Sequence, residues 1–175
     1  MLTTADGAGP VTLVPHSNAG LYAPTLAEQL DVVATVFVDA ALPGEGPKTA
    51  MAPPGLMAVL RDLADADGVL PPWTRWWDKE DIAGLFPSDN VRVSVKATQP
   101  RLPLSYFTAR LPVPPGWLEQ PSAYLAFGDT YADEVAFALA NKWPLNVMAG
   151  LHLQMLHDPV GVGAEILRLE ALLTV

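Results

Sequence analysis

Short apolar runs and helical patterns alternate over the first 39 residues. Residues 11–15 form an apolar run that predicts a buried strand, and a helical pattern follows over residues 18–30. Pro24 lies inside this pattern and should kink the helix or loosen its first turns. Residues 31–38 are almost continuously apolar and β-branched, which is typical of a strand covered on both faces. Asp39 stands where that strand should end.

The middle of the chain, residues 40–115, has a different pattern. It is rich in proline and tryptophan, and residues 54–66 and 73–86 have helical patterns. Residues 91–95 alternate apolar with polar positions, as a short strand would, and their type stays open. Prolines stop helices and central strands, and they divide this region into short segments. We interpret it as an inserted, mainly helical cap.

The alternation of strands and helices resumes after the cap. The expected elements are a strand over 123–127, a helix over 131–141, a short strand over 144–148 and a closing amphipathic helix over 160–173. Such alternation predicts an α/β fold with a doubly wound, mostly parallel sheet. The chain therefore divides into a first part of the core over residues 1–39, the cap over 40–115 and a C-terminal part of the core over 116–175.

Composition and charge narrow the classes of function. The chain has 175 residues, of which half are hydrophobic and 17% are charged, so it should fold as one domain rather than remain disordered. The net charge of −9, with few and scattered basic residues, argues against a nucleic-acid partner. No secretory signal and no membrane-length apolar run are visible, so we expect a cytoplasmic protein without membrane association.

The sequence also argues against a metal or another cofactor. It contains no cysteine, and its three histidines are scattered without clustered carboxylates, so no metal-ligand set is apparent. A glycine-rich phosphate loop is absent as well. We therefore expect no cofactor.

Ser17 stands where the first predicted strand turns into a helix. A sharp strand-to-helix turn exposes a serine hydroxyl as a nucleophile, usually within Gly-x-Ser-x-Gly. Here the five residues are Pro-His-Ser-Asn-Ala, with Gly20 one place later, so Pro15 and Ala19 depart from that pattern. The alternative is that Ser17 is a helix N-cap.

His152 follows the last predicted strand, in the kind of loop where open α/β sheets place catalytic groups. It could accept the proton of Ser17 as a general base; the alternative is a structural loop histidine. Asp129, which follows the strand over 123–127, is the first choice for the acid that orients His152. Asp39 is the alternative acid, and His16 is assigned no catalytic role.

Trp73, Trp76 and Trp77 form an aromatic cluster within the cap. A helix over residues 73–86 would place all three indoles on one face. They either pack the cap onto the core or line an apolar pocket for a small-molecule substrate.

Serine, acid and histidine in this chain order, on alternating strands and helices, resemble an α/β-hydrolase. The resemblance covers nearly the whole chain and is carried by Pro-His-Ser-Asn-Ala-Gly, by the Phe-Val-Asp of residues 37–39 and by the His-x-x-Met-Leu-x-Asp-Pro of residues 152–159. It implies a serine hydrolase that acts through an acyl-enzyme, with Ser17 as nucleophile, His152 as proton carrier and Asp129 as orienting acid. The backbone N–H of Asn18 would be one oxyanion donor.

The chain departs from the family in two places. The usual glycine followed three residues later by Asp falls on Gly128 and Tyr131. Only ten residues precede the nucleophile strand, so the resemblance implies that the early strands and the second oxyanion donor are missing. Losing one donor typically costs on the order of 10²–10³ in rate. A stripped sheet edge would favour self-association, and the chain would then be a truncated product or an incomplete gene model.

These observations predict a hydrolase that cleaves an ester-like or amide-like bond of a small, fairly apolar substrate. The alternative is a truncated, non-catalytic homologue that binds a small molecule or a partner. Non-hydrolytic chemistry on the same scaffold, such as that of a lyase, is a third hypothesis.

Overall fold

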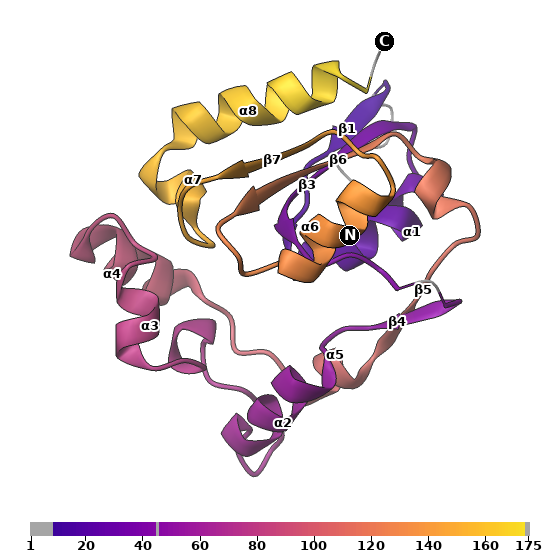
Figure 1. The fold of residues 1–175 in the computed structure, drawn as a ribbon. Helices are drawn as coiled ribbons and strands as arrows, with labels where there is room; N and C mark the ends of the chain where they lie inside the picture. Colours follow the sequence, from indigo (N-terminus) through magenta and orange to yellow (C-terminus); the bar gives the residue numbers. More distant parts are fainter. Residues whose placement is uncertain (1–8, 45, 174–175) are drawn as a thin grey trace.

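The core of the protein is a parallel β-sheet (Figure 1). The computed structural model describes residues 9–44 and 46–173. In these residues the sheet has the order β1-β3-β6-β7, and β2 continues the pairing of β1 along β3. Its strands are β1 (Val11–Leu13), β2 (His16–Ser17), β3 (Val32–Ala40), β6 (Ser122–Phe127) and β7 (Leu145–Met148). All of their pairings are parallel, so the predicted α/β class is confirmed.

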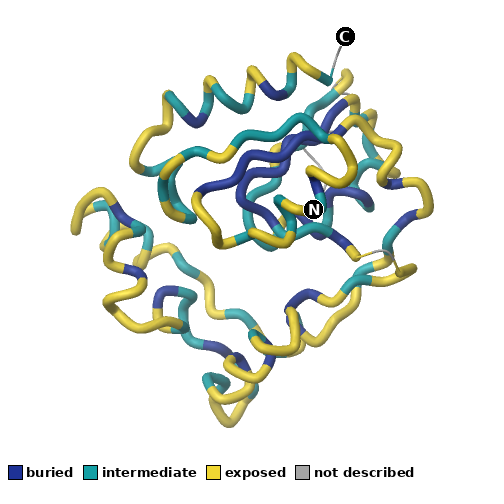
Figure 2. Tube along the Cα trace, in the orientation of Figure 1, coloured by how far each residue is buried: buried dark blue, intermediate teal, exposed yellow. Residues whose placement is uncertain are grey.

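Helices cover both faces of this sheet, because successive residues of the two central strands point to opposite sides. Val36 and Val38 of β3 pack with α8 (Pro159–Ala171) through Val162 and Leu169. On the other face, Phe37 packs in a cluster with residues of three further elements. These are α1 (Ala23–Ala27), η3 (Trp117–Glu119) and α6 (Ala132–Ala140). Figure 2 shows the central strands as the most buried part of the molecule.

The segment between β3 and β6 lies beside the sheet and has a hydrophobic cluster of its own (Figure 1). This cluster is built around Met57, Leu60, Leu70 and Phe107. The elements of the segment are β4 (Lys48–Ala50), α2 (Pro54–Leu63), η2 (Trp73–Arg75), α3 (Lys79–Ala83), α4 (Asp89–Thr98), α5 (Leu104–Thr108) and β5 (Arg110–Pro112). β4 and β5 pair antiparallel, which ties together the two chain segments that connect this region to the core.

Three sequence-based expectations about local structure need correction or completion. The helix expected over residues 73–86 is divided into the 3-10 turn η2 and the short helix α3, because Asp78 has an extended backbone between them. Residues 91–95 belong to the helix α4, whose first turn is capped by the Ser88 hydroxyl accepting from the Val91 N–H. The pattern over residues 18–30 gives the 3-10 turn η1 (Asn18–Tyr22) followed by α1, with Pro24 in the first turn of α1.

Pro15 occupies a position in the sheet that tolerates proline. Within the described residues, β1 and β2 pair only with β3, so Pro15 lies on the edge of this sheet. Its carbonyl accepts the N–H of Val38 at 2.9 Å, and the N–H that proline lacks is not needed by β3. Across these same residues, no helix combines the length and apolar character required to cross a bilayer.

Gly20 allows the turn after Ser17 to approach β3 closely. A Cβ at this position would collide with the Ala41 carbonyl oxygen and lie 3.1 Å from the Ala40 Cβ. Both neighbours belong to β3 or to the residue after it, so neither can move freely. The spacing between η1 and the end of β3 therefore requires glycine.

We predict that Gly20→Ala lowers the free energy of unfolding by roughly 1–3 kcal/mol, the usual cost of overpacking. Gly163→Ala is the matched control, because Gly163 lies within α8 and a Cβ there meets nothing within 4 Å. The control should raise the free energy of unfolding by about 0.5–1 kcal/mol. Urea unfolding followed by far-UV circular dichroism measures both; equal effects of the two substitutions would contradict the close approach.

Candidate active site

Ser17 lies at the junction of β2 and η1 with a backbone conformation that is rare for a residue with a side chain. Its φ is 56° and its ψ is −136°. Its carbonyl accepts the N–H of Ala41 at 3.1 Å, which holds the junction against β3. The hydroxyl does not cap η1 and instead lies 3.3 Å from the hydroxyl of Tyr131. A strained strand-to-helix turn whose serine hydroxyl does not cap the helix has the form of a nucleophile elbow.

His152 and Asp39 form the shortest contact of the site that involves an ionisable pair. His152 lies in the loop after β7, and its Nδ1 is 2.6 Å from Oδ2 of Asp39. Asp39 is completely buried, and its other carboxylate oxygen accepts the N–H of Phe127 at 2.9 Å. With Nδ1 donating to the carboxylate, Nε2 of a neutral His152 is left as a proton acceptor.

The structure places Asp39, not Asp129, against His152. Asp129 is exposed, and no hydrogen bond to His152 is found for it within the described residues. Gly128, with a φ of 64°, stands between the end of β6 and Asp129. Asp39 instead is the penultimate residue of the central strand β3, and it bonds the backbone of Phe127 at the end of β6. The structure therefore brings the alternative acid, and not the first choice, into contact with His152.

His16 packs directly on His152. The two rings stack with their centroids 4.5 Å apart, and Nε2 of His16 lies 2.9 Å from the backbone carbonyl oxygen of His152, to which it donates. Burial lowers the pKa of His16, and the neighbouring His152 lowers it further. His16 therefore stays neutral and holds the backbone of the loop that carries His152, a contact that the sequence did not indicate.

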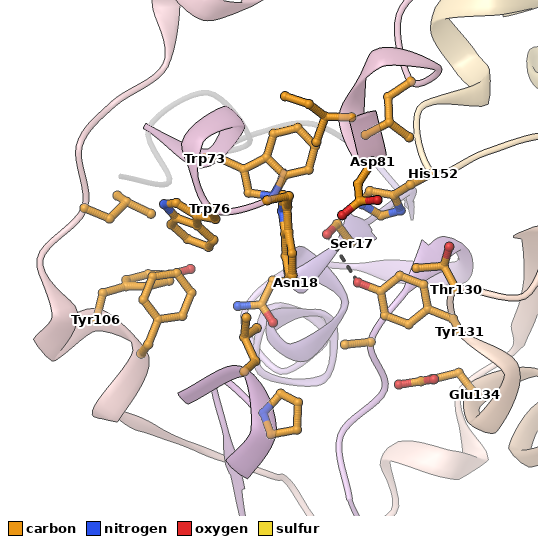
Figure 3. Close-up of a pocket in the computed structure, with 18 residues that line it drawn as sticks. Ser17, Asn18, Trp73, Trp76, Asp81, Tyr106, Thr130, Tyr131, Glu134 and His152 are labelled. Carbon is orange, nitrogen blue, oxygen red and sulfur yellow. Dashed lines mark hydrogen bonds between the residues drawn. The ribbon is translucent and has the colours of Figure 1, made fainter. Parts of the chain in front are cut away.

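Tyr131 and Glu134 come from the start of α6 and face the same site (Figure 3). The Tyr131 ring is 5.7 Å from the His152 ring, measured between centroids. Burial raises the pKa of Tyr131, so its hydroxyl keeps its proton and can donate to Ser17. Burial also raises the pKa of Glu134, as do the nearby charges of Asp133 and Asp39.

A cavity of about 580 Å³ lies between the core and the segment that joins β3 to β6. Ser17, Asn18 and His152 line it from the core, as Figure 3 shows. Trp73, Trp76 and Trp77 line it from the opposite segment, although only Trp73 lies within η2. The remaining residues of the lining are Ala41, Pro53, Leu56, Asp81, Ile82, Leu85, Leu102, Tyr106, Phe107, Thr130, Tyr131 and Glu134.

Asn18 contributes more than a backbone group to this region. Its side-chain Nδ2 is buried and has no hydrogen-bond partner among the residues that the structure describes. No group of three or more His, Asp or Glu side chains suited to a metal ion occurs in that part of the chain. The side chains gathered at the site offer a serine hydroxyl, an imidazole, a carboxylate, a phenol and the amide of Asn18.

Comparison with known proteins identifies the fold. No family model matches the chain, and no curated protein matches its sequence. An extracellular α/β-hydrolase from a Paenibacillus species, described as homologous to tobacco salicylic acid binding protein 2, aligns with a TM-score of 0.66 and 17% identity, covering 89% of this chain and 69% of that one. A methylesterase from Arabidopsis aligns with a TM-score of 0.60 and 17% identity, covering 98% and 74%.

A polyneuridine aldehyde esterase is also similar, with a TM-score of 0.64, 13% identity and coverage of 97% of this chain and 75% of that one. The chain therefore has the α/β-hydrolase fold, in agreement with the resemblance noted in the sequence. Tomato methylketone synthase I shares the fold as well, with a TM-score of 0.63 and 11% identity, covering 97% of this chain and 73% of that one. Because its name describes a synthase, the fold by itself does not define the reaction.

The sequence alone left three residues of the site unassigned. His16 stands beside Ser17, but nothing in the sequence indicates a contact with a loop 136 positions away. Tyr131 falls where the family carries its acid, and that mismatch was the available signal. Glu134 follows the expected start of a helix, where an acidic residue is common for electrostatic reasons alone.

We predict that titration of His16 lowers the free energy of unfolding in mild acid. Because its pKa is lowered from 6.5 in the folded chain, the unfolded chain binds a proton that the folded chain does not, and the free energy of unfolding falls as the pH drops below 6.5. His16→Gln keeps an N–H donor but cannot titrate, so it should lose less stability between about pH 7.5 and about pH 5.5. Urea unfolding at both pH values measures this, with the exposed His157→Gln as control; identical pH dependence in wild type and His16→Gln would refute it.

Proposed function

We propose that the protein is a serine hydrolase that cleaves an ester-like or amide-like bond of a small, fairly apolar molecule. The observation that carries the proposal is the hydrogen bond between the buried Asp39 carboxylate and His152. His152 and the strained Ser17 line the same cavity. These are the three roles of a nucleophile, a base and an orienting acid. Two proteins of the same fold are a methylesterase and an esterase, which is in keeping with this chemistry.

In the proposed reaction, Ser17 Oγ attacks the carbonyl carbon of the substrate while Nε2 of His152 takes its proton. The tetrahedral intermediate collapses as His152 returns that proton to the leaving alcohol or amine, and an acyl-enzyme remains on Ser17. Water, activated by His152 in the same way, then releases the acid product and restores the serine. Asp39 keeps the Nδ1 proton in place and stabilises the imidazolium that forms twice in the cycle.

Tyr131 and Asn18 assist this reaction in different ways. In this proposal the protonated Tyr131 hydroxyl, 3.3 Å from Ser17 Oγ, is the donor, which leaves the Ser17 proton free to be directed toward His152. The backbone N–H of Asn18, directly after the nucleophile, is the oxyanion donor in this proposal. We assign Tyr131 to positioning of the nucleophile and Asn18 to electrostatic stabilisation.

A non-catalytic binding module is the second candidate. The observation in its favour is that Ser17 Oγ bonds to Tyr131, with no hydrogen bond to His152 among the described contacts. Catalytic hydrogen bonds are often long in ligand-free enzymes and tighten only when substrate binds, so the hydrolase remains the better account. The two candidates differ in whether Ser17 reacts.

We predict that a fluorophosphonate probe labels the wild-type protein at Ser17. Ser17→Ala should abolish labelling, and His152→Ala should slow it by roughly 10²–10⁴, the range of general base catalysis. The adduct is located by mass spectrometry of the intact and digested protein. Absence of labelling in a protein with native circular dichroism would refute the hydrolase and favour the binding module.

The same assay separates the two candidate acids. Asp39→Asn should slow labelling by roughly 10²–10⁴, because an amide stabilises the wrong imidazole tautomer. Asp129→Asn is the matched control and should leave the labelling rate unchanged, since Asp129 is exposed. The opposite outcome would return the orienting role to Asp129. Near-UV circular dichroism of both variants checks that the loss of the buried charge has not unfolded the chain.

Removal of the Tyr131 hydroxyl should slow the reaction less than the substitutions of Ser17, His152 or Asp39. We predict that Tyr131→Phe lowers kcat on an activated ester roughly 2- to 15-fold with little change in KM, the value of one neutral hydrogen bond. Thr25→Val is the control, because it removes a hydroxyl that donates to the Pro112 carbonyl at 3.3 Å, and neither residue lines the cavity. An unchanged kcat in Tyr131→Phe would show that its bond to Ser17 plays no part in the reaction.

A further inference from the structure

Five aromatic side chains line the cavity on the side that faces the core. Trp73, Trp76, Trp77, Tyr106 and Phe107 all line it from the segment between β3 and β6. Several of these rings are fixed in place. The Trp76 Nε1–H donates to the Pro71 carbonyl at 2.7 Å, and the Trp76 ring meets Phe107 edge to face with centroids 5.3 Å apart. Phe107 in turn meets Tyr106 edge to face at 4.8 Å.

The charged groups of the same lining are acidic. Glu134 lines the cavity from the first turn of α6 and is half-buried, whereas Asp81 lines it from α3 and is exposed. The lining contains no Lys or Arg, and within the described residues neither carboxylate forms an ion pair. Burial, together with Asp133 and Asp39, holds the pKa of Glu134 above its ordinary value. A raised pKa is what the carboxyl group of Glu134 should show when it is partly buried near other acids and no cationic side chain offsets them.

From this lining we infer that the cavity accepts a substrate that carries an alkylammonium group, bound between the aromatic wall and the carboxylates of Glu134 and Asp81. The inference rests on the proposed function, because it names the class of substrate that Ser17 would attack. Aromatic rings attract a cation through their π faces, and an ammonium group also supplies the charge that the acidic groups lack. Substrates with a carboxylate of their own are disfavoured for the same reason.

The arrangement in Figure 3 suits a molecule with a cationic end and a reactive bond. Trp73, Trp76 and Tyr106 lie on one side of Ser17 and Asn18, while Tyr131 and Glu134 lie on the other. The cavity of about 580 Å³ is of the size that holds small ligands. An aromatic wall alone would bind a neutral apolar substrate equally well. The deciding comparison is therefore between two ligands of the same shape, one charged and one neutral.

The first experiment measures binding to the wild-type protein without any reaction. Choline and 3,3-dimethylbutan-1-ol have the same shape and differ only in that a quaternary nitrogen replaces a carbon. Titration followed by tryptophan fluorescence should show choline binding at least about tenfold more tightly, the advantage of a partly desolvated cation–π contact. The preference should shrink as salt is added, because Asp81 is exposed and its charge is screened.

Variants locate the binding site. Glu134→Gln and Asp81→Asn should each weaken choline binding roughly two- to fivefold and leave binding of the neutral alcohol unchanged. Asp78→Asn is the matched control, since Asp78 is exposed close to Asp81 in the chain but does not line the cavity. Trp76→Leu should weaken choline binding more than alcohol binding. Equal effects of Asp78→Asn and Asp81→Asn would overturn the assigned site.

The second experiment measures turnover. Acetylthiocholine and 3,3-dimethylbutyl thioacetate are compared by their kcat/KM, and the released thiol is measured with a thiol reagent, without background because the protein has no cysteine. Tight choline binding without hydrolysis of either ester, and without fluorophosphonate labelling of Ser17, would support the cation site and refute the hydrolase. Hydrolysis of both esters without a preference for the cationic one, and without choline binding, would overturn the cation site and leave the hydrolase standing. Absence of both choline binding and hydrolysis would overturn the cation site as well.

Discussion

The buried carboxylate of Asp39 connects the parts of the molecule that make up the candidate site. It lies at the end of β3, takes one hydrogen bond from the backbone of β6 and another from His152 in the loop after β7. A buried charge is costly unless its lone pairs are satisfied, so these two donors are requirements of the fold as well as features of the site. The loop that carries His152 is consequently held at the carboxyl edge of the sheet, where Ser17 also lies.

A second constraint acts at the same edge from the other side. Ser17 adopts a positive φ, and the turn after it packs against the end of β3 through Gly20. A conformation of this kind costs on the order of 1–3 kcal/mol, and it persists because the β2–β3 pairing and the core beneath it hold the chain in place. His16, one residue earlier, extends this rigidity to the histidine loop by stacking on His152 and bonding its backbone. The same short segment, His16 and Ser17, therefore carries the strained backbone of Ser17 and the contacts that hold the loop of His152.

Whereas η3 packs in the core, the segment from β4 to β5 adds a wall to this edge. Its own cluster around Leu60 and Phe107 is separate from the clusters that cover the sheet. The β4–β5 pair ties its two ends together, so its aromatic residues face the core across the cavity. In the proposed hydrolase, the core would supply the reactive groups and the segment from β4 to β5 the surfaces that select a substrate. The acidic character of the lining, with Glu134 contributed by the core and Asp81 by the insertion, comes from both parts.

The alternation of apolar runs and helical patterns was sufficient to predict the parallel sheet, because β3 and β6 are buried on both faces and leave a continuous apolar signature. It was also sufficient to single out Ser17 and His152, since each follows a predicted strand at the edge where α/β sheets place functional groups. The pairing of Asp39 with His152, the stacking of His16 and the contact of Tyr131 with Ser17 join residues that are far apart in the chain. Asp39 and Asp129 both follow predicted strands, and the sequence favoured Asp129. In the structure Asp129 is exposed, whereas Asp39 is buried and bonds both the backbone of β6 and His152. Local patterns decide which residues reach the edge of the sheet, whereas only the packing of three strand ends in space decides which of them meet.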